Sequence, residues 1–463
     1  MQAEPVIVIF DVGKTNKKFF LFNEHYKIVY TRSEQFPETV DEDGYPCDDV
    51  QLLSDWVLHS LNEVLQLKEY EIKAVNFSAY GASFVHIDAA GKAVTPLYNY
   101  LKPFPEVLAD QFYKQYGSRE EMALQTASPV LGNLNSGMQL YRLKYEKPEV
   151  FAKIAYSLHL PQYLSYLVSR KLASDITSIG CHTLLWDFNI QSYHHWVIEE
   201  GLAAKLPGIC AADTTVVAKV NDKEIPTGIG LHDSSSALIP YLVNFHESFV
   251  LISTGTWCIS LNPFNEAPLT FDELKSDCLC YLTYKGKPVK ASRLFAGYEH
   301  EQQTKRIAAF FQKEASFYQH IEYDITIIEK LRKKNTLSAA GHAQMLEQSL
   351  FAQRELASFS DETEAYHQLI FDIVAQQLHS TQLVLKGAAV KRIFVDGGFS
   401  KNPIYMNLLA AFFPAIEVYA ASMAQATAVG AALAIHQTWN SKGLPNDLIE
   451  LKYYALTEQV ELN

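Results

Sequence analysis

The chain contains 463 residues, enough for two domains that each bury a hydrophobic core. Hydrophobic residues make up 48% and charged residues 20% of it, which excludes a disordered or fibrous chain and is typical of a globular protein. The formal net charge of −13 excludes the basic surface with which proteins bind the phosphates of nucleic acids.

The first predicted element is a hairpin with an unusual turn. Apolar runs at residues 6–10 and 18–22 predict two strands, and the sequence DVGKTNKK joins them. Backbone N–H groups in such a turn form a concavity that suits phosphate oxygens, and Gly13 allows a close approach because it lacks a side chain. Thr15 adds a hydroxyl donor, and Asp11 can hold Mg²⁺ directly or through water. The turn is either a phosphate-binding loop or a plain hairpin with polar turn residues.

A helix and two further strands follow the hairpin. Residues 48–67 carry apolar side chains on one helical face, and Asp49 is placed to cap the N-terminus of this helix. Residues 74–77 and 84–87 have the apolar character of strands. The acidic sequence DEDGYPCDD before the helix lacks the spacing of an EF-hand and is interpreted as a solvated loop.

An aspartate opens the next predicted helix. Asp233 precedes SSSALIPYL and is placed at a helix N-terminus, where the helix dipole keeps a carboxylate ionised. It is either a catalytic carboxylate or a simple N-cap. His232 is interpreted as a neighbour that makes local hydrogen bonds and not as a metal ligand, because no second residue has the spacing of a metal ligand. We expect it on the substrate side.

The hairpin design recurs in the middle of the chain. Residues 248–264, SFVLISTGTWCISLNPF, give an apolar strand, a small polar turn and a second apolar strand. The turn offers Thr254, Gly255 and Thr256 to phosphates, without a carboxylate.

The repeated hairpin predicts a duplicated α/β fold. We expect an N-terminal domain at residues 1–244, a C-terminal domain at 245–440 and a tail at 441–463. Residues 363–385 predict a long helix that belongs either to the core or to a homodimer interface.

A double glycine follows a later strand, in VDGGFSKN. Gly397 and Gly398 allow a nucleotide to lie flat against the backbone, and Asn402 can bond an adenine or ribose edge. The alternative is a turn followed by a helix cap, with Pro403 in the first turn of the helix. Neither a Walker A sequence nor a complete dinucleotide fingerprint is present.

Five sequences resemble the motifs of the FGGY carbohydrate kinases, in the same order and at similar spacing: DVGKTNKK, GLHDSSSAL, STGTWCIS, DGGFSKNPIYMNLLAAFF and ATAVGAALAI. The resemblance extends from residue 7 to about residue 435. It implies a duplicated actin-like (RNase H-type) α/β fold with a cleft between two domains. Within the family, HDSSSA, STGTW and DGYPCDD are most similar to the L-rhamnulokinases, and the L-fuculokinases and xylulokinases are less similar.

The resemblance also implies roles for particular residues. Asp233 corresponds to the general base, and Asp11 to the aspartate associated with Mg²⁺. The implied ATP- and phosphate-binding residues are Gly13, Thr15, Lys18, Thr254, Gly255, Thr256, Gly397, Gly398 and Asn402.

The predicted acceptor side departs from the family pattern. Ser83 stands where rhamnulokinases usually have an aspartate, and PLYNYLKPFPE has Asn99 without the usual Arg-Asp pair. Tyr80, Tyr98 and Tyr100 can stack on a sugar face, while Ser83 and Asn99 can bond its hydroxyls. An unpaired polar group in a buried site costs about 1–3 kcal/mol, so these changes predict a different acceptor.

These observations predict an ATP- and Mg²⁺-dependent kinase of a small sugar, a ketose or deoxyketose such as L-rhamnulose or L-fuculose. The alternative is a non-catalytic actin-like protein that binds nucleotide and assembles or regulates.

We expect a cytoplasmic protein that binds neither membranes nor nucleic acid. Its six cysteines have no CxxC spacing and are interpreted as reduced thiols. Its first residues lack the features of a signal peptide. Residues 418–440 are uncharged but too weakly apolar for a membrane span, and predict a strand that leads into a buried helix.

Overall fold

The computed structural model describes residues 3–334 and 348–455, which divide into two compact units. The first unit comprises Met1–Asn244, Cys280–Pro288 and Ala424–Leu448, and the second comprises Phe245–Leu279, Val289–Met423 and Ile449–Asn463. The predicted division at residues 244 and 440 treats each domain as one continuous stretch, whereas the first compact unit takes in two later segments. The predicted domain limits therefore stay a prediction.

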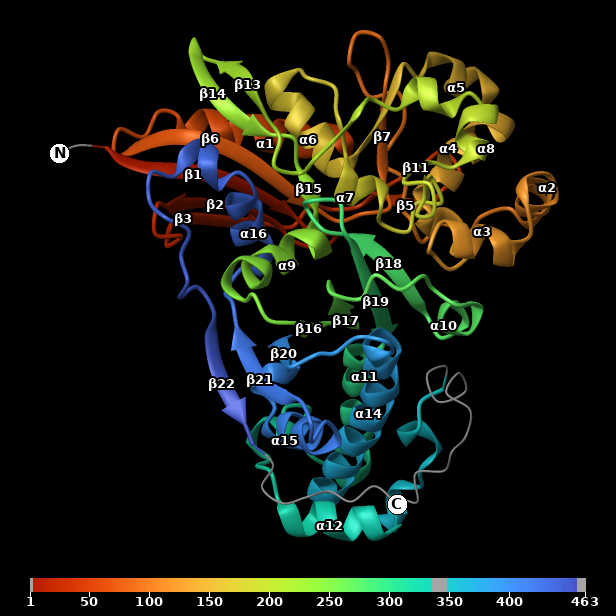
Figure 1. Ribbon diagram of the computed structural model, residues 1–463, viewed down its shortest axis with the longest axis vertical. Helices are drawn as coiled ribbons and strands as arrows, with labels where there is room; N and C mark the ends of the chain where they lie inside the picture. Colours follow the sequence, from red (N-terminus) through yellow and green to blue (C-terminus); the bar gives the residue numbers. More distant parts are fainter. Residues whose placement is uncertain (1–2, 335–347, 456–463) are drawn as a thin grey trace. The chain divides into compact units, whose positions relative to one another are not determined.

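The first unit is built on a mixed seven-stranded sheet (Figure 1). The predicted hairpin is confirmed: its two strands are antiparallel, and the first of them is parallel to the strand that follows the first helix. In sheet order the strands are β13 (Thr215–Val220), β14 (Lys223–Gly228), β6 (Tyr70–Ala79), β1 (Glu4–Val12), β2 (Lys17–Asn23) and β3 (Ile28–Glu34), with β15 (Leu231–His232) also paired to β6.

The alternation of side chains along β1 explains how helices cover this sheet. Val6, Val8 and Phe10 join one core cluster with Trp56 of α1 (Val50–Val64) and Leu164 of α6 (Leu160–Ser169). Asp49 caps α1 as predicted, since its side chain accepts hydrogen bonds from the first-turn backbone. The helix α16 (Ala426–Ala434) packs against β1, β6 and α9 (Asp233–Asn244).

A second core cluster of the first unit lies around Phe112 and Trp196, whose rings meet edge to face with centroids 5.0 Å apart. The remaining helices of this unit are α2 (Glu106–Tyr116), α3 (Arg119–Gln125), α4 (Ser136–Glu146), α5 (Pro148–Lys153), α7 (Ile176–Ile179), α8 (His195–Glu199) and α17 (His436–Trp439). Its short strands are β4 (Thr39–Val40), β5 (Pro46–Cys47), β7 (Phe84–Ile87), β8 (Tyr156–His159), β9 (Ser174–Asp175), β10 (Trp186–Asp187), β11 (Ser192–Tyr193) and β12 (Ile209–Cys210).

The second unit repeats the hairpin design. Its first strand is antiparallel to the next one and parallel to a later strand, as in the first unit. In sheet order the strands are β19 (Pro288–Leu294), β17 (Cys258–Asn262), β16 (Phe249–Thr254), β20 (Arg392–Gly397), β21 (Glu417–Ser422) and β22 (Glu450–Tyr454). A further strand, β18 (Cys278–Leu282), contains residues of both units. The predicted duplicated α/β fold is confirmed.

The long helix of the second unit, α14 (Glu362–Leu385), lies beside α11 (Ala296–Phe311) and packs also against α12 (Ile325–Lys334) and α15 (Pro403–Phe412) (Figure 1). Most of its side chains are buried, as expected for a core helix, which is one of the two alternatives that the sequence left open. A short helix, α10 (Phe271–Lys275), begins with a capping box. Among the described residues, no helix has both the length and the apolar character that a membrane crossing requires.

Candidate functional site

The end of β1 carries the first predicted phosphate loop. Gly13 N donates to Asn16 O at 2.9 Å, and a Cβ at Gly13 would lie only 3.1 Å from that oxygen. Thr15 lies exposed at the tip of the turn. Asp11 and Lys18 face each other across the β1–β2 ladder, immediately before and after the turn. The hairpin thus carries the predicted carboxylate and ammonium groups on its two strands and the predicted hydroxyl at its tip.

Three parallel strand ends bring Asp11, Tyr80 and Asp233 to one edge of the first sheet. In the register of this sheet, Ser78 of β6 lies opposite both Asp11 and Leu231. Tyr80 follows the end of β6 directly, and its N–H bonds Val12 O at 3.1 Å. Asp233 follows β15 and opens α9. The carboxyl ends of parallel strands are the usual location of ligand sites in α/β sheets.

The two carboxylates at this edge have unusual acidities. Burial, and after it the charge of Asp233, raises the pKa of Asp11 to about 7, although the positive charge of Lys18 acts to lower it. Burial raises the pKa of Asp233 to about 6, against the hydrogen bonds from Ser234. Raised carboxylate pKa values mark places where negative charge is held in a poorly solvated setting, as in many active sites.

His232 is the immediate partner of Asp233. Its Nε2 lies 3.1 Å from Asp233 Oδ1 and 3.2 Å from Cys181 Sγ. Burial lowers the pKa of His232 to about 3, so the ring beside the Asp233 carboxylate is a neutral imidazole. A Cβ at Gly81 would come within 2.9 Å of the His232 ring, so only glycine leaves space for it. The sequence analysis missed Gly81, because no local pattern connects it to His232.

The predicted sugar-contacting residues divide into two groups. The ring centroids of Tyr80 and Tyr100 lie 6.0 Å apart. Burial raises the pKa of Tyr100, the charge of Lys14 acts to lower it, and the charge of Asp233 acts to raise it. Ser83 is buried, and among the described residues its hydroxyl has no hydrogen-bond partner. Asn99 stabilises its own turn, because its side-chain oxygen accepts from Leu101 N at 2.9 Å.

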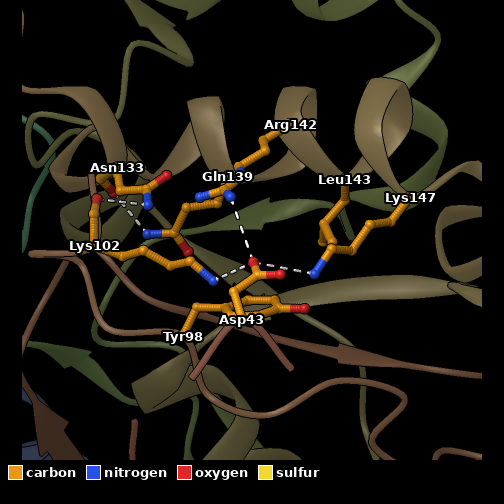
Figure 2. Close-up of a pocket in the computed structure, with 8 residues that line it drawn as sticks. All are labelled: Asp43, Tyr98, Lys102, Asn133, Gln139, Arg142, Leu143 and Lys147. Carbon is orange, nitrogen blue, oxygen red and sulfur yellow. Dashed lines mark hydrogen bonds and ion pairs between the residues drawn. The ribbon is translucent and has the colours of Figure 1, made fainter. Parts of the chain in front are cut away.

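Tyr98 lies in a different place, a small cavity of about 20 Å³ shown in Figure 2. Its hydroxyl donates to Glu42 Oε1 at 2.5 Å. The Lys102 and Lys147 ammonium groups point toward the Asp43 carboxylate beside it, at 2.6 and 3.4 Å (Figure 2). The structure therefore places Tyr98 in a network of paired charges and not with Tyr80 and Tyr100.

In the second unit, the second predicted phosphate loop and the double glycine are held together by hydrogen bonds and close packing. Thr254 Oγ1 donates to Asp396 O at 2.6 Å and accepts from Phe399 N at 3.0 Å. Gly397 has a φ of +94°, and a Cβ there would lie 1.9 Å from Thr254 O. Glycine at position 397 is thus a requirement of both the backbone conformation and the packing.

The rest of this loop packs on the first turn of α11. Gly255 N donates to Trp257 O at 2.9 Å, and Thr256 O accepts from Tyr298 N at 3.1 Å. A Cβ at Gly297 would lie 1.8 Å from Gly255 O. The loop is therefore fixed by backbone contacts with α11, whose residues lie outside the STGTWCIS motif.

A cavity of about 540 Å³ opens beside these glycines in the second unit. It is lined by Thr254, Gly255, Gly297, His300, Tyr318, Gln319, Ile321, Tyr366, Gly398, Phe399, Lys401, Asn402 and Pro403. Its aromatic wall was missed by the sequence analysis, since His300, Tyr318 and Tyr366 come from three distant segments. His300 Nε2 lies 3.0 Å from the Tyr366 hydroxyl.

Asn402 serves two structural functions in this cavity. Its side-chain oxygen accepts from Ile404 N and Tyr405 N, which makes it the N-cap of α15. Its amide donates to the Tyr366 hydroxyl at 2.8 Å. The cap alternative is therefore observed, and a contact of Asn402 with an adenine or ribose stays a prediction.

Comparison with known proteins defines the family. The model for the N-terminal domain of the FGGY family of carbohydrate kinases matches residues 6–239, and the model for the C-terminal domain of carbohydrate kinase FGGY matches residues 246–442. The chain belongs to the FGGY family of carbohydrate kinases. Its fold is the duplicated actin-like α/β fold that the motifs implied.

Individual relatives are distant. A carbohydrate kinase from Novosphingobium aromaticivorans superimposes with a TM-score of 0.79 at 22% identity, covering 98% of this chain and 95% of that one. A glycerol kinase from Plasmodium falciparum, solved with ADP, gives a TM-score of 0.72 at 16% identity, with 94% and 90% covered. A rhamnulokinase from Halalkalibacterium halodurans is 23% identical over 264 residues, 54% of each chain. The match thus spans about half the length of such curated relatives.

Proposed function

We propose that the protein transfers the γ-phosphoryl group of ATP to a hydroxyl of a small sugar, a ketose or deoxyketose such as L-rhamnulose or L-fuculose. Membership of the FGGY family supports a sugar kinase, and relatives named rhamnulokinase support a ketose acceptor. The observation that carries the proposal is the Asp233 carboxylate, held at the sheet edge with a pKa of about 6.

Asp233 is the general base of this proposal. A pKa near 6 leaves the carboxylate mostly ionised at neutral pH, yet makes it a better proton acceptor than an ordinary aspartate. It takes the proton of the sugar hydroxyl as that oxygen bonds to phosphorus. Ser234 N donates a hydrogen bond to Asp233 Oδ1 at 2.6 Å, and the neutral ring of His232 lies beside the same oxygen, with Nε2 at 3.1 Å.

Asp11 is the residue that would hold Mg²⁺. Its carboxylate oxygen suits this ion, which keeps most of its waters and binds proteins through one or two carboxylates. Burial and then the charge of Asp233 raise the pKa of Asp11, and this supports the proposal because a bound cation would favour the ionised carboxylate. When bound, Mg²⁺ neutralises the phosphate oxygens of the nucleotide.

The second unit is proposed to hold the nucleoside of ATP. Its cavity of about 540 Å³ lies within the usual range of small-molecule sites, roughly 300–1,000 Å³. Gly398 lines it, and a Cβ there would meet no protein atom within 4 Å, so the backbone is open to a ligand. Thr254, Gly255 and Thr256 are proposed phosphate contacts, as are Gly13, Thr15 and Lys18 of the first unit.

The acceptor is proposed to pack on the rings of Tyr80 and Tyr100. Tyr80 follows the end of β6 at the sheet edge and its ring lies beside that of Tyr100, whereas the Tyr98 hydroxyl donates a hydrogen bond to Glu42. Aromatic rings suit the apolar face of a sugar. Because the Tyr98 hydroxyl is bonded to Glu42 and the Asn99 side-chain oxygen to Leu101 N, the acceptor has fewer polar partners than the sequence predicts.

A panel assay tests the proposal. Purified protein with Mg-ATP is incubated with L-rhamnulose, L-fuculose, D- and L-xylulose, L-ribulose and glycerol, and ADP release is measured. One strong ketose responder is expected, with release at least tenfold above the sugar-free rate. ATP binding without a response to any sugar would contradict the proposal and favour the non-catalytic nucleotide-binding alternative.

A further inference from the structure

Four side chains from three segments form a buried ionic cluster, the Asp48 cluster, made up of Lys14, Lys17, Asp48 and Tyr80. Asp48 Oδ2 accepts from Lys14 Nζ at 2.6 Å and from the Tyr80 hydroxyl at 2.8 Å. Asp48 Oδ1 accepts from Lys17 Nζ at 3.3 Å. The Asp48 carboxylate thus bonds two lysines of the first hairpin and, through the oxygen that Lys14 also bonds, the tyrosine of the proposed acceptor side.

The burial of this cluster makes Asp48 indispensable to its partners. The Lys17 side chain is only 2% exposed, and the Asp48 side chain only 10%. Burial alone would raise the pKa of Asp48, but the hydrogen bond from Lys14 and the charges of both lysines bring it below its usual value. An ionised carboxylate here offsets two ammonium groups, and its removal would leave a buried charge uncompensated.

On one side, the cluster fixes the first phosphate loop. Lys14 is a residue of the turn itself, between Gly13 and Thr15. Lys17 Nζ, held by Asp48, also donates to the backbone oxygen of Lys14 at 2.8 Å. The carboxylate therefore controls both a side chain and a carbonyl of the loop.

On the other side, the cluster contacts the proposed acceptor site. Tyr80 presents its ring beside Tyr100 while its hydroxyl bonds Asp48. The backbone of Asp48 also pairs with Leu97, at the start of the segment that carries Tyr100. An acceptor that packs on the Tyr80 ring would restrict the hydroxyl to one position, which favours one arrangement of the carboxylate and of the loop.

We propose that Asp48 is a positioning residue that couples the acceptor side of the site to the first phosphate loop through the oxygen shared by Tyr80 and Lys14. The coupling rests on the proposed function, because the acceptor and the phosphates are those of a sugar kinase. It favours transfer to a sugar over transfer to water, since an acceptor on the Tyr80 ring stabilises the arrangement of Asp48 that holds the loop.

Hydrogen exchange tests the positioning role without reference to activity. The backbone amides of residues 11–18 are compared in the full-length wild type, Asp48→Asn and the control Glu38→Gln. Glu38 bonds the same Lys14 ammonium at 3.3 Å but is half exposed, so its loss should change little. Exchange about tenfold faster in Asp48→Asn and unchanged in Glu38→Gln is expected. Equal exchange in both variants would overturn the proposal. If Asp48→Asn does not fold, Lys14→Met is used, because it keeps the Asp48–Lys17 pair.

A double-mutant cycle tests the coupling. The ratio of sugar-dependent to sugar-independent ADP release is measured for Tyr80→Phe, Lys14→Met and the double variant. Each single change is expected to lower the ratio by about fivefold. The double variant should have a ratio no lower than that of the more affected single variant, because both changes act through one oxygen. Effects that multiply would overturn the coupling. A wild type that is silent with every sugar overturns the proposed function instead, and hydrogen exchange then decides the role of Asp48.

Discussion

At the scale of single residues, the setting of Asp233 supports the chemical role that we propose for it. The sequence places an aspartate at the start of a helix, where a cap and a base look alike. The structure adds His232 Nε2 at 3.1 Å and burial that raises the pKa of the carboxylate to about 6. These features distinguish Asp233 from Asp49, which caps α1 through ordinary backbone bonds.

The raised pKa of Asp233 predicts a pH profile. A general base works in its deprotonated form, so sugar phosphorylation should be present above pH 6 and should fall about tenfold per unit below it. Initial rates between pH 4.5 and 8, with the coupling enzymes checked separately at each pH, measure the midpoint. A rate that stays constant down to pH 4.5, as an ordinary aspartate would give, contradicts this assignment.

The residues of the proposed acceptor side show the limit of sequence reasoning. Tyr98 and Tyr100 are both plausible stacking groups in the sequence, but Tyr98 is bonded to Glu42. Asp48 looked like part of a solvated acidic loop, whereas it is a buried partner of Lys14 and Lys17. Local patterns could not reveal either fact, because the partners are separated from these residues by tens of positions in the chain.

At the scale of elements, the two hairpins were predictable because apolar alternation and a polar turn are local signals. The double-glycine turn was predictable for the same reason, but its tight fit was not. Gly397 requires a positive φ, and a Cβ there would collide with Thr254 of another strand. Gly398 has an ordinary helical backbone and open space around it.

This contrast gives a matched pair of variants. Gly397→Ala should destabilise the protein by about 1–3 kcal/mol and weaken ATP binding, because the strained alanine displaces the second phosphate loop. Gly398→Ala should change the free energy of unfolding by less than about 0.5 kcal/mol. Thermal or denaturant unfolding, together with ATP titration, measures both effects. Equal stability of the two variants would show that the collision is relieved by a small backbone shift.

At the scale of the whole molecule, the family and the duplicated fold could be predicted from five ordered motifs. The composition of the compact units could not, because residues 280–288 and 424–448 join the first unit only through tertiary contacts. The motif ATAVGAALAI illustrates this, since Gly430 packs so closely on α9 that a Cβ would lie 1.9 Å from Ser236 O. Small residues at such a contact are explained only by the partner helix.

The most direct test of the central claim is the transfer of phosphate from γ-labelled ATP to sugar by the wild type and by Asp233→Asn, with ATP binding measured in the same samples. We predict that the variant binds ATP within about twofold of the wild type and loses at least a hundredfold in transfer, as removal of a general base typically causes. Full transfer by Asp233→Asn would contradict the account.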